Sequence, residues 1–419
     1  MLPWETAYQA ASNFMAHSTT CCYGLKTYGW KEGYISIMNN GMREASQVIL
    51  SFRRIPPGVS NELLANLWMF RNRLATLDCD KVYSFIGLLR SPDVAIQPDY
   101  QKPFEDLCCE VVITDIQASG NLHALRGIRT ATLGQEPRKY TQSKSARTAT
   151  WSTDWSDFNY WAEDQPRILT EFYKQIYSTS GPHQSRVPEH MGVAGITAPL
   201  QVAGRVFDSV IYTSIMFHEF ETWTLDLRDL RVLLRAFNSH YKDTSYVGGG
   251  RTFSAFWRTL LGDCFLPYRE SQDLFHSLQT SKDGSCKLSI RRVVAADCLP
   301  FLLWWFGRVR RLEVEKVKKI STIPAVININ ASFMRATSGR RMFITSQGYI
   351  GLGPEHTQCG DQVAVLLGGS TPFMLREAGS TAAGEAQWSL LGDCYVHGCM
   401  DGELVEGQRV EDWLMMVLR

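Results

Sequence analysis

The hydrophobic pattern changes along the chain, from helical spacing in the first half to short alternating runs near the C-terminus. Several stretches place apolar residues at every third or fourth position, which predicts amphipathic helices. These stretches are residues 4–15, 61–73, 103–116, 225–240 and 253–261. Residues 331–419 instead alternate apolar and polar residues between Gly, Pro and Asp, a pattern typical of short antiparallel strands joined by tight turns. We therefore predict an α+β fold, with a largely helical first half and a C-terminal antiparallel β module, either a small sheet or a barrel.

The same pattern suggests how the chain is organised. Helical and β segments interleave without a long linker, so we expect residues 1–419 to form one continuous domain. Within it, residues 1–190 are mainly helical, residues 191–330 hold a β-hairpin plus helices, and residues 331–419 form the β module. The hairpin is expected from the alternation over residues 198–212, with its turn near Ala203 and Gly204.

Composition and charge exclude several classes of protein. The chain has 43 basic and 42 acidic residues, so no excess of positive charge favours nucleic acid as a partner. The most apolar run, residues 298–306, is shorter than the ~18 residues that cross a bilayer, and we expect no membrane span. The 11 cysteines follow no disulfide framework and no signal segment opens the sequence, which favours a reduced, cytoplasmic setting.

Motifs for cofactor and nucleophile chemistry are missing from the sequence. Neither glycine-rich stretch, 248–250 or 348–353, has the strand, spacing and helix of a nucleotide-binding loop, and no G-x-S-x-G elbow occurs. His356, Cys359, Cys394, His397 and Cys399 have spacing similar to that of a zinc site. However, strand alternation would place Cys394 and Cys399 on opposite faces, and buried free cysteines are common. We predict neither a metal nor a cofactor.

Polar side chains with catalytic potential gather in the C-terminal module. Its aspartates at 361, 393 and 401 follow or precede glycines, where Asp commonly caps its own turn. Tyr395, His397, Arg376 and Glu403 have no such turn explanation, and we take them as candidate catalytic residues. A structural hydrogen-bonding role is the alternative for each of these four.

Aromatic residues are abundant, with 12 tryptophans in the chain. Large rings line pockets for apolar ligands, although they also pack within cores. We expect Trp304, Trp305 and Tyr349 to form the wall of a substrate pocket, with a hydrophobic small molecule as the partner. The oligomeric state has no signature in the sequence.

Several blocks of the chain resemble a known protein family. Residues 348–354 read Gly-Tyr-Ile-Gly-Leu-Gly-Pro, and residues 392–403 run from Gly-Asp-Cys-Tyr-Val-His to Asp-Gly-Glu. Together with Trp257-Arg-Thr-Leu and Pro372-Phe-Met-Leu-Arg, they resemble the region behind the HET domain of fungal heterokaryon-incompatibility (HET) proteins. The resemblance extends over residues 61–403, whereas the sequence blocks of the HET domain itself are missing.

This resemblance has two functional implications. Relatives of HET proteins in fungal secondary metabolism include cofactor-free cyclases, so the first hypothesis is a cyclase of the Diels-Alderase type acting on a terpenoid or polyketide. Tyr395, His397 and Arg376 would polarise the substrate in a pocket of about 300–1,000 Å³ walled by Trp304 and Trp305. The alternative is a non-enzymatic self/non-self recognition or interaction protein, which needs an exposed surface and no enclosed pocket.

Overall fold

The computed structural model describes most of the chain from residue 62 onward. The described residues are 62–69, 75–86, 89, 96–127, 149–156, 175–185, 199–217, 235, 237, 239, 245–267, 290–309, 323–381, 384–409 and 413–419. They lie in one of two compact units, the one formed by Ser60–Leu274 and Leu288–Arg419. The helix predicted over residues 4–15 and most of that predicted over residues 225–240 fall outside the described residues.

Helices dominate the described part of the first half, as the spacing predicts. They are α3 (Glu62–Met69), α4 (Asp80–Ile86) and α5 (Phe104–Ser119), followed by the short 3₁₀ helix η1 (His123–Leu125). Pro103 is the N-cap of α5, and Gly120 ends the helix with φ +67°, a conformation that glycine adopts without steric cost. No helix in the described ranges is long and apolar enough to cross a membrane.

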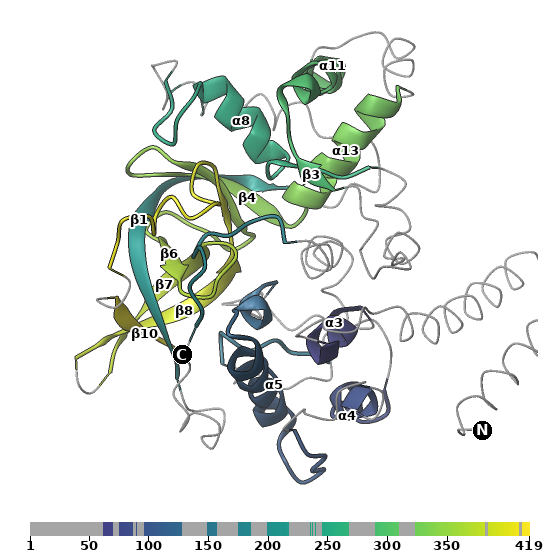
Figure 1. Cartoon of the computed structure of the whole chain (residues 1–419), viewed down its shortest axis with the longest axis vertical. Helices are drawn as coiled ribbons and strands as arrows, with labels where there is room; N and C mark the ends of the chain where they lie inside the picture. Colours follow the sequence, from purple (N-terminus) through teal and green to yellow (C-terminus); the bar gives the residue numbers. More distant parts are fainter. Residues whose placement is uncertain are drawn as a thin grey trace, which may run out of the picture. The chain divides into compact units, whose positions relative to one another are not determined.

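A second group of helices lies later in the chain, with one helix before a two-stranded sheet and the others after it (Figure 1). It consists of α8 (Thr252–Leu260), the 3₁₀ helix η3 (Ala295–Asp297), α11 (Cys298–Val309) and α13 (Pro324–Thr337). Strands β2 (Cys264–Phe265) and β3 (Arg291–Arg292) pair between them. The helix predicted over residues 253–261 is confirmed as α8, whose apolar face buries Phe256 and Leu260.

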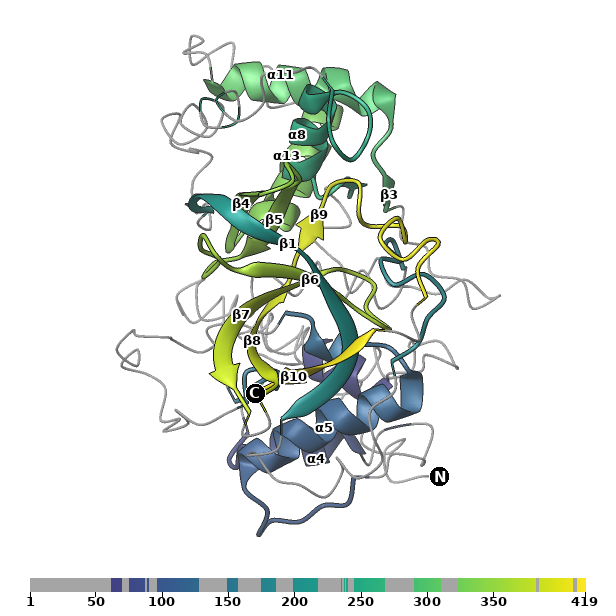
Figure 2. The same ribbon diagram turned by 90° about the vertical axis from the view of Figure 1, so that its left-hand side faces the viewer.

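The β module is a closed five-stranded barrel, seen along its opening in Figure 2. Its strands are β1 (Leu200–Phe217), β6 (Gln362–Leu366), β7 (Phe373–Ser380), β8 (Ala386–Asp393) and β10 (Leu414–Leu418). β10 closes the barrel because it pairs with β1 on one side and with β8 on the other. The predicted α+β class is confirmed, with β10 and β8 as a parallel pair in an otherwise antiparallel barrel.

Three further strands extend the sheet from the second half of β1. They are β4 (Arg340–Thr345), β5 (Ile350–Pro354) and β9 (Tyr395–Val396). A buried cluster fills the space where the barrel and these strands meet. It contains Val210, Phe343, Val363, Met374, Leu391, Cys394, Val396 and Cys399.

The hairpin predicted near Ala203 and Gly204 is wrong, because residues 200–217 form one continuous strand. Gly204 has no positive φ and makes no turn. It pairs with Leu414 of β10 and with Leu366 of β6, at the point where β1 passes from one partner to the other. A Cβ there would lie 2.4 Å from the Leu366 side chain and 2.9 Å from the Val365 carbonyl oxygen. The glycine therefore permits close strand approach at a barrel corner.

Candidate functional site

Tyr395 and His397, two of the predicted site residues, lie together at β9. The Tyr395 hydroxyl and His397 Nδ1 share a hydrogen bond of 2.7 Å. Backbone pairing fixes both residues: Tyr395 lies opposite Leu352 in β5, and the His397 N–H donates to the Ile350 carbonyl. Tyr246 supports the pair by donating its hydroxyl proton to the His397 carbonyl over 3.0 Å.

Burial keeps this pair uncharged at neutral pH. Burial, with help from the positive charge of Arg258 and Arg292, lowers the pKa of His397 to about 4. Burial also raises the pKa of the Tyr395 hydroxyl well above its usual range. Neither group has a pKa near neutrality, which is where a general acid or base is most effective.

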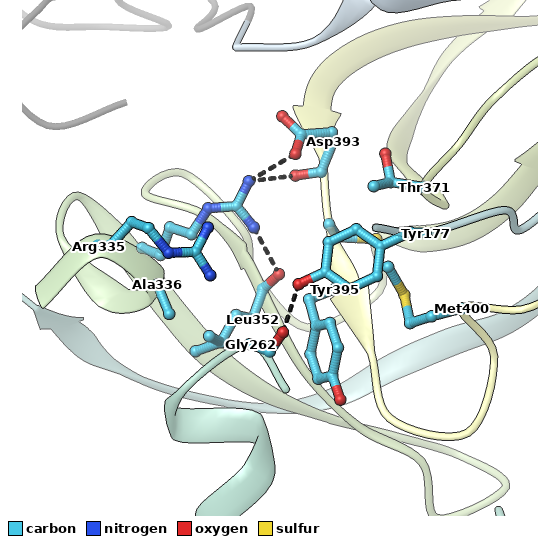
Figure 3. A pocket seen from close by; sticks show the side chains of 11 residues that line it. Tyr177, Gly262, Arg335, Ala336, Leu352, Thr371, Asp393, Tyr395 and Met400 are labelled. Carbon is cyan, nitrogen blue, oxygen red and sulfur yellow. Dashed lines mark hydrogen bonds and ion pairs between the residues drawn. The ribbon is translucent and has the colours of Figure 1, made fainter. Parts of the chain in front are cut away.

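A small, partly open cavity lies beside Tyr395 (Figure 3). Its lining includes Tyr177, Arg335, Arg340, Thr371, Asp393 and Tyr395. The space open to the centre of a water molecule is about 20 Å³, which is room for one or two waters. The cavity is therefore far smaller than the pocket expected for a terpenoid or polyketide.

A buried ion pair forms one side of the cavity. Arg340, at the start of β4, donates to the Asp393 carboxylate over 2.9 Å, to the Asp393 carbonyl over 2.9 Å and to the Leu352 carbonyl over 3.0 Å. Asp393 also accepts the Gly127 N–H over 3.0 Å. Because Arg340 and Asp393 are 5% and 2% exposed, water does not screen the pair. It joins β4, β5, the end of β8 and the segment after η1.

A charged network contacts Tyr177, another residue of the cavity lining. Asp263 pairs with Arg258 over 2.8 Å and with Arg292 over 3.1 Å, and Arg292 also pairs with Asp401. The Arg292 guanidinium lies 4.7 Å from the centre of the Tyr177 ring, whose hydroxyl donates to the Gly262 carbonyl. Burial raises the pKa of the Asp263 carboxyl, although the charges of Arg258 and Arg292 act in the opposite direction. Asp263 also has φ +48°, unusual for a residue other than glycine.

Arg376 and Glu403 do not join Tyr395 and His397. Arg376 lies in β7, where it binds Asp361 over 2.7 Å and the His356 carbonyl over 2.8 Å. Glu403 is exposed and accepts the Asp401 N–H over 2.6 Å, the geometry of a local turn. Asp361 caps the Gln358 N–H as its turn predicts, yet it also serves as the partner of Arg376.

The predicted aromatic wall lies in packed core, away from the cavity. Trp304 and Trp305 are 2% and 6% exposed in α11. Trp304 packs against Phe333 of α13 at 4.7 Å and donates its indole N–H to Asn330, while Trp305 stacks on Phe301.

Tyr349 lies in the turn before β5, and its surroundings are also aromatic. Its ring contacts Phe207 at 5.7 Å and Tyr246 at 6.3 Å, both edge-to-face. Neither Tyr349 nor the two tryptophans line the cavity beside Tyr395.

The cysteines of the zinc-like spacing are buried apolar groups. Cys394 and Cys399 belong to the same core cluster, so the expectation that they face opposite sides is wrong. Burial raises the pKa of both thiols, which keeps them protonated. In the described ranges, no three His, Cys, Asp or Glu side chains are placed to hold a metal ion.

Sequence reasoning missed most of the cavity. Tyr177, Thr371 and the nearby residues Arg335 and Arg340 come from three separate parts of the chain, and no local motif marks them. Arg335 and Thr371 are 7% and 3% exposed, and Arg335 Nε and Thr371 Oγ1 have no hydrogen-bond partner among the described residues. The cavity is therefore a place where a small polar molecule can accept and donate hydrogen bonds.

Comparison with known proteins agrees with this architecture. Residues 315–416 match the Het-6 beta-barrel domain, so the C-terminal part of the chain is a barrel of the Het-6 type. The matched range covers β6, β7, β8 and the first part of β10, but not β1, which comes from the middle of the chain.

The chain is also distantly similar to a curated fungal protein. It is 22% identical over 373 residues to Heterokaryon incompatibility protein 6, OR allele, of Neurospora crassa. The match covers 80% of this chain and 50% of that protein, so the chain spans about half the length of its relative. No solved structure matches the chain. The predicted resemblance to HET proteins is therefore confirmed in two respects. The C-terminal region matches the Het-6 barrel domain, and the chain is distantly similar to one HET protein.

Proposed function

We propose that this protein is a non-enzymatic recognition protein of the heterokaryon-incompatibility type. The observation that carries the proposal is the similarity to Heterokaryon incompatibility protein 6, which extends over 80% of the chain and so reaches well beyond the matched barrel region, residues 315–416. A barrel whose strands come from distant parts of the chain provides a rigid support for surface loops and helices. In this role the protein would bind another protein and catalyse no reaction.

The interior of the described part supports recognition over cyclisation. A cyclase needs room to fold its substrate, whereas the cavity beside Tyr395 has room for only one or two molecules the size of water. Trp304 and Trp305, the expected pocket wall, make core contacts with Phe333 and Phe301. Core packing thus accounts for these two rings without a ligand.

Helix α11 supplies an exposed surface of the kind that recognition requires. Leu299, Leu303 and Phe306 are 65%, 37% and 43% exposed. Their spacing of four and three residues puts them on one face of the helix, opposite the buried Phe301 and Trp304. A contiguous apolar row of this kind is typical of protein interaction sites. We expect it to contact an apolar surface of the partner protein.

A heterokaryon assay tests the proposal. The full chain is expressed in one of two Neurospora crassa strains that otherwise form a viable heterokaryon, across strains carrying different incompatibility alleles. We expect at least a tenfold loss of viable heterokaryons in one allelic combination. The double variant Leu299→Asp/Leu303→Asp is expected to restore viability, because two charges on the α11 face oppose apolar docking.

A matched variant and a chemical assay complete this test. Leu77, also exposed at 52%, lies outside α11, and Leu77→Asp should keep the wild-type effect. Unchanged viability in every combination would contradict recognition. Incubation of the purified chain with reactive linear dienes addresses the cyclase hypothesis: product ratios that differ from the uncatalysed reaction, and that change with Tyr395→Phe, would favour catalysis instead.

A further inference from the structure

Arg335 is a buried charge without a partner. It lies in the last turn of α13, is 7% exposed, and makes no hydrogen bond or ion pair within the described part of the chain. Its guanidinium extends from the helix toward Gly262 and Leu352 at the cavity (Figure 3). Buried arginines are otherwise almost always paired, because a guanidinium removed from water loses its hydration.

Nearby acceptors already have donors. The Asp393 carboxylate binds Arg340 and the Gly127 N–H. The Leu352 carbonyl also accepts from Arg340. The Gly262 carbonyl accepts from Tyr177. Each of these acceptors is therefore engaged by another donor, and none of them accepts from Arg335.

The charges around the cavity do not balance. The cavity lining contains two guanidinium groups, those of Arg335 and Arg340, and one carboxylate, that of Asp393. Arg340 pairs with Asp393, so the unmatched positive charge belongs to Arg335. A bound anion would neutralise it.

We propose that this cavity binds the carboxylate group of a small organic acid. A guanidinium presents two parallel N–H donors that match the two oxygens of a carboxylate. Thr371, at the same cavity, offers a hydroxyl donor that has no partner within the described residues. With about 20 Å³ open to the centre of a water molecule, the cavity suits a small anion such as formate or acetate. The site is independent of the proposed recognition role.

The first experiment measures thermal stability of the full chain while sodium chloride is replaced by sodium acetate or sodium formate at constant ionic strength. A ligand that binds only the folded state raises Tm as its concentration exceeds Kd. We expect a saturating rise of several degrees with millimolar acetate or formate. Arg335→Met should abolish the rise, and Arg335→Lys should reduce it because lysine lacks the paired donors. Arg205→Met, at an exposed arginine of β1, should respond as the wild type does.

A second measurement does not depend on a variant that must fold. The line width of ¹³C-acetate in the presence of wild-type protein should increase and should recover when excess formate competes for the site. Equal Tm responses in wild type and Arg335→Met, or an unbroadened acetate signal, would overturn the proposal. A rise in Tm with inorganic phosphate but not with acetate or formate would overturn the choice of carboxylate. None of these outcomes depends on the heterokaryon assay.

Discussion

At the scale of single residues, buried polar contacts set the geometry around Tyr395. Arg340 and Asp393 are both almost fully buried, and Arg340 also binds two backbone carbonyls. Removing one member of a buried pair leaves the other charge without compensation, which typically costs about 3–5 kcal/mol. Exposed pairs contribute far less because water screens them.

The first prediction concerns this ion pair. We expect Asp393→Ala to lower the free energy of unfolding by about 3–5 kcal/mol, measured by urea denaturation at neutral pH. Glu110→Gln, which breaks the pair between Glu110 of α5 and Lys102 just before that helix, should cost about 1 kcal/mol or less because the two side chains are 28% and 26% exposed. Similar losses of stability in the two variants would show that the buried charge of Arg340 does not need Asp393 for its compensation.

The second prediction concerns acid stability. Burial depresses the pKa of His397 from 6.5 to about 4, so between these values the unfolded state binds more protons than the folded state. The contribution of His397 to the free energy of unfolding is therefore fully present above pH 6.5 and is lost as the pH is lowered toward 4. We expect His397 to contribute about 2 kcal/mol of the loss between pH 7 and 4.5.

The variant His397→Gln isolates that contribution in urea denaturation at both pH values. It should lose less stability on acidification than the wild type. The slope that remains includes His123, whose pKa burial lowers to about 3. An identical pH dependence in wild type and variant would mean that His397 does not titrate in this range.

At the scale of elements, β1 shows how a local pattern can mislead. The alternation and the glycine of residues 198–212 are typical of a hairpin, yet the strand runs through because each part of it finds a different partner. Helices such as α5 and α8 were predictable because their apolar spacing and end signals act within a few residues. A turn at Gly204 competes with pairing to β6 and β10, and the pairing prevails.

The third prediction tests the close approach at Gly204. Gly204→Ala places a Cβ against Leu366 and the Val365 carbonyl, and we expect a loss of about 1–3 kcal/mol in the free energy of unfolding. Gly181→Asn is the control, because nothing lies within 4 Å of its Cβ and its φ of +59° suits asparagine. Urea denaturation distinguishes the two variants, because a lower midpoint with an unchanged m-value reports a loss of stability. Equal, small losses would show that the strands can separate at this corner.

At the scale of the whole molecule, the barrel depends on strands far apart in sequence. β1 is separated from the other barrel strands by the α8, α11 and α13 group, and β10 is the last strand of the chain. β10 joins them by pairing with β1 and β8, and the Arg419 backbone extends this closure by pairing with Thr150 and Trp388. Without β10, two strand edges would face solvent.

The fourth prediction follows from this closure. Deleting residues 413–419 should expose the edges of β1 and β8, abolish cooperative thermal unfolding and produce aggregates in size-exclusion chromatography. Leu414→Ser is the control, since the Leu414 side chain is 79% exposed and its loss should change stability by less than about 0.5 kcal/mol. A monomeric truncated chain with an unchanged Tm would show that closure by β10 is dispensable.

The sequence by itself determined the α+β class, the helices α3, α5 and α8, and the likeness of the C-terminal blocks to HET proteins. These features depend on periodicity, turn chemistry and residue order, which are local properties of the chain. Residue type also brought Tyr395 and His397 forward among four candidates, whereas the hydrogen bond between them is a finding of the structure.

Only the tertiary structure decided the rest, because it depends on contacts between distant segments. Pairing of β1 with β6 and β10 closed the barrel, and pairing of the neighbouring strands β6 and β7 placed Arg376 beside Asp361. Packing of α11 on α13 placed Trp304 in the core. Arg335, in the last turn of α13, lies at the cavity without a counter-charge, which no spacing in the sequence could indicate.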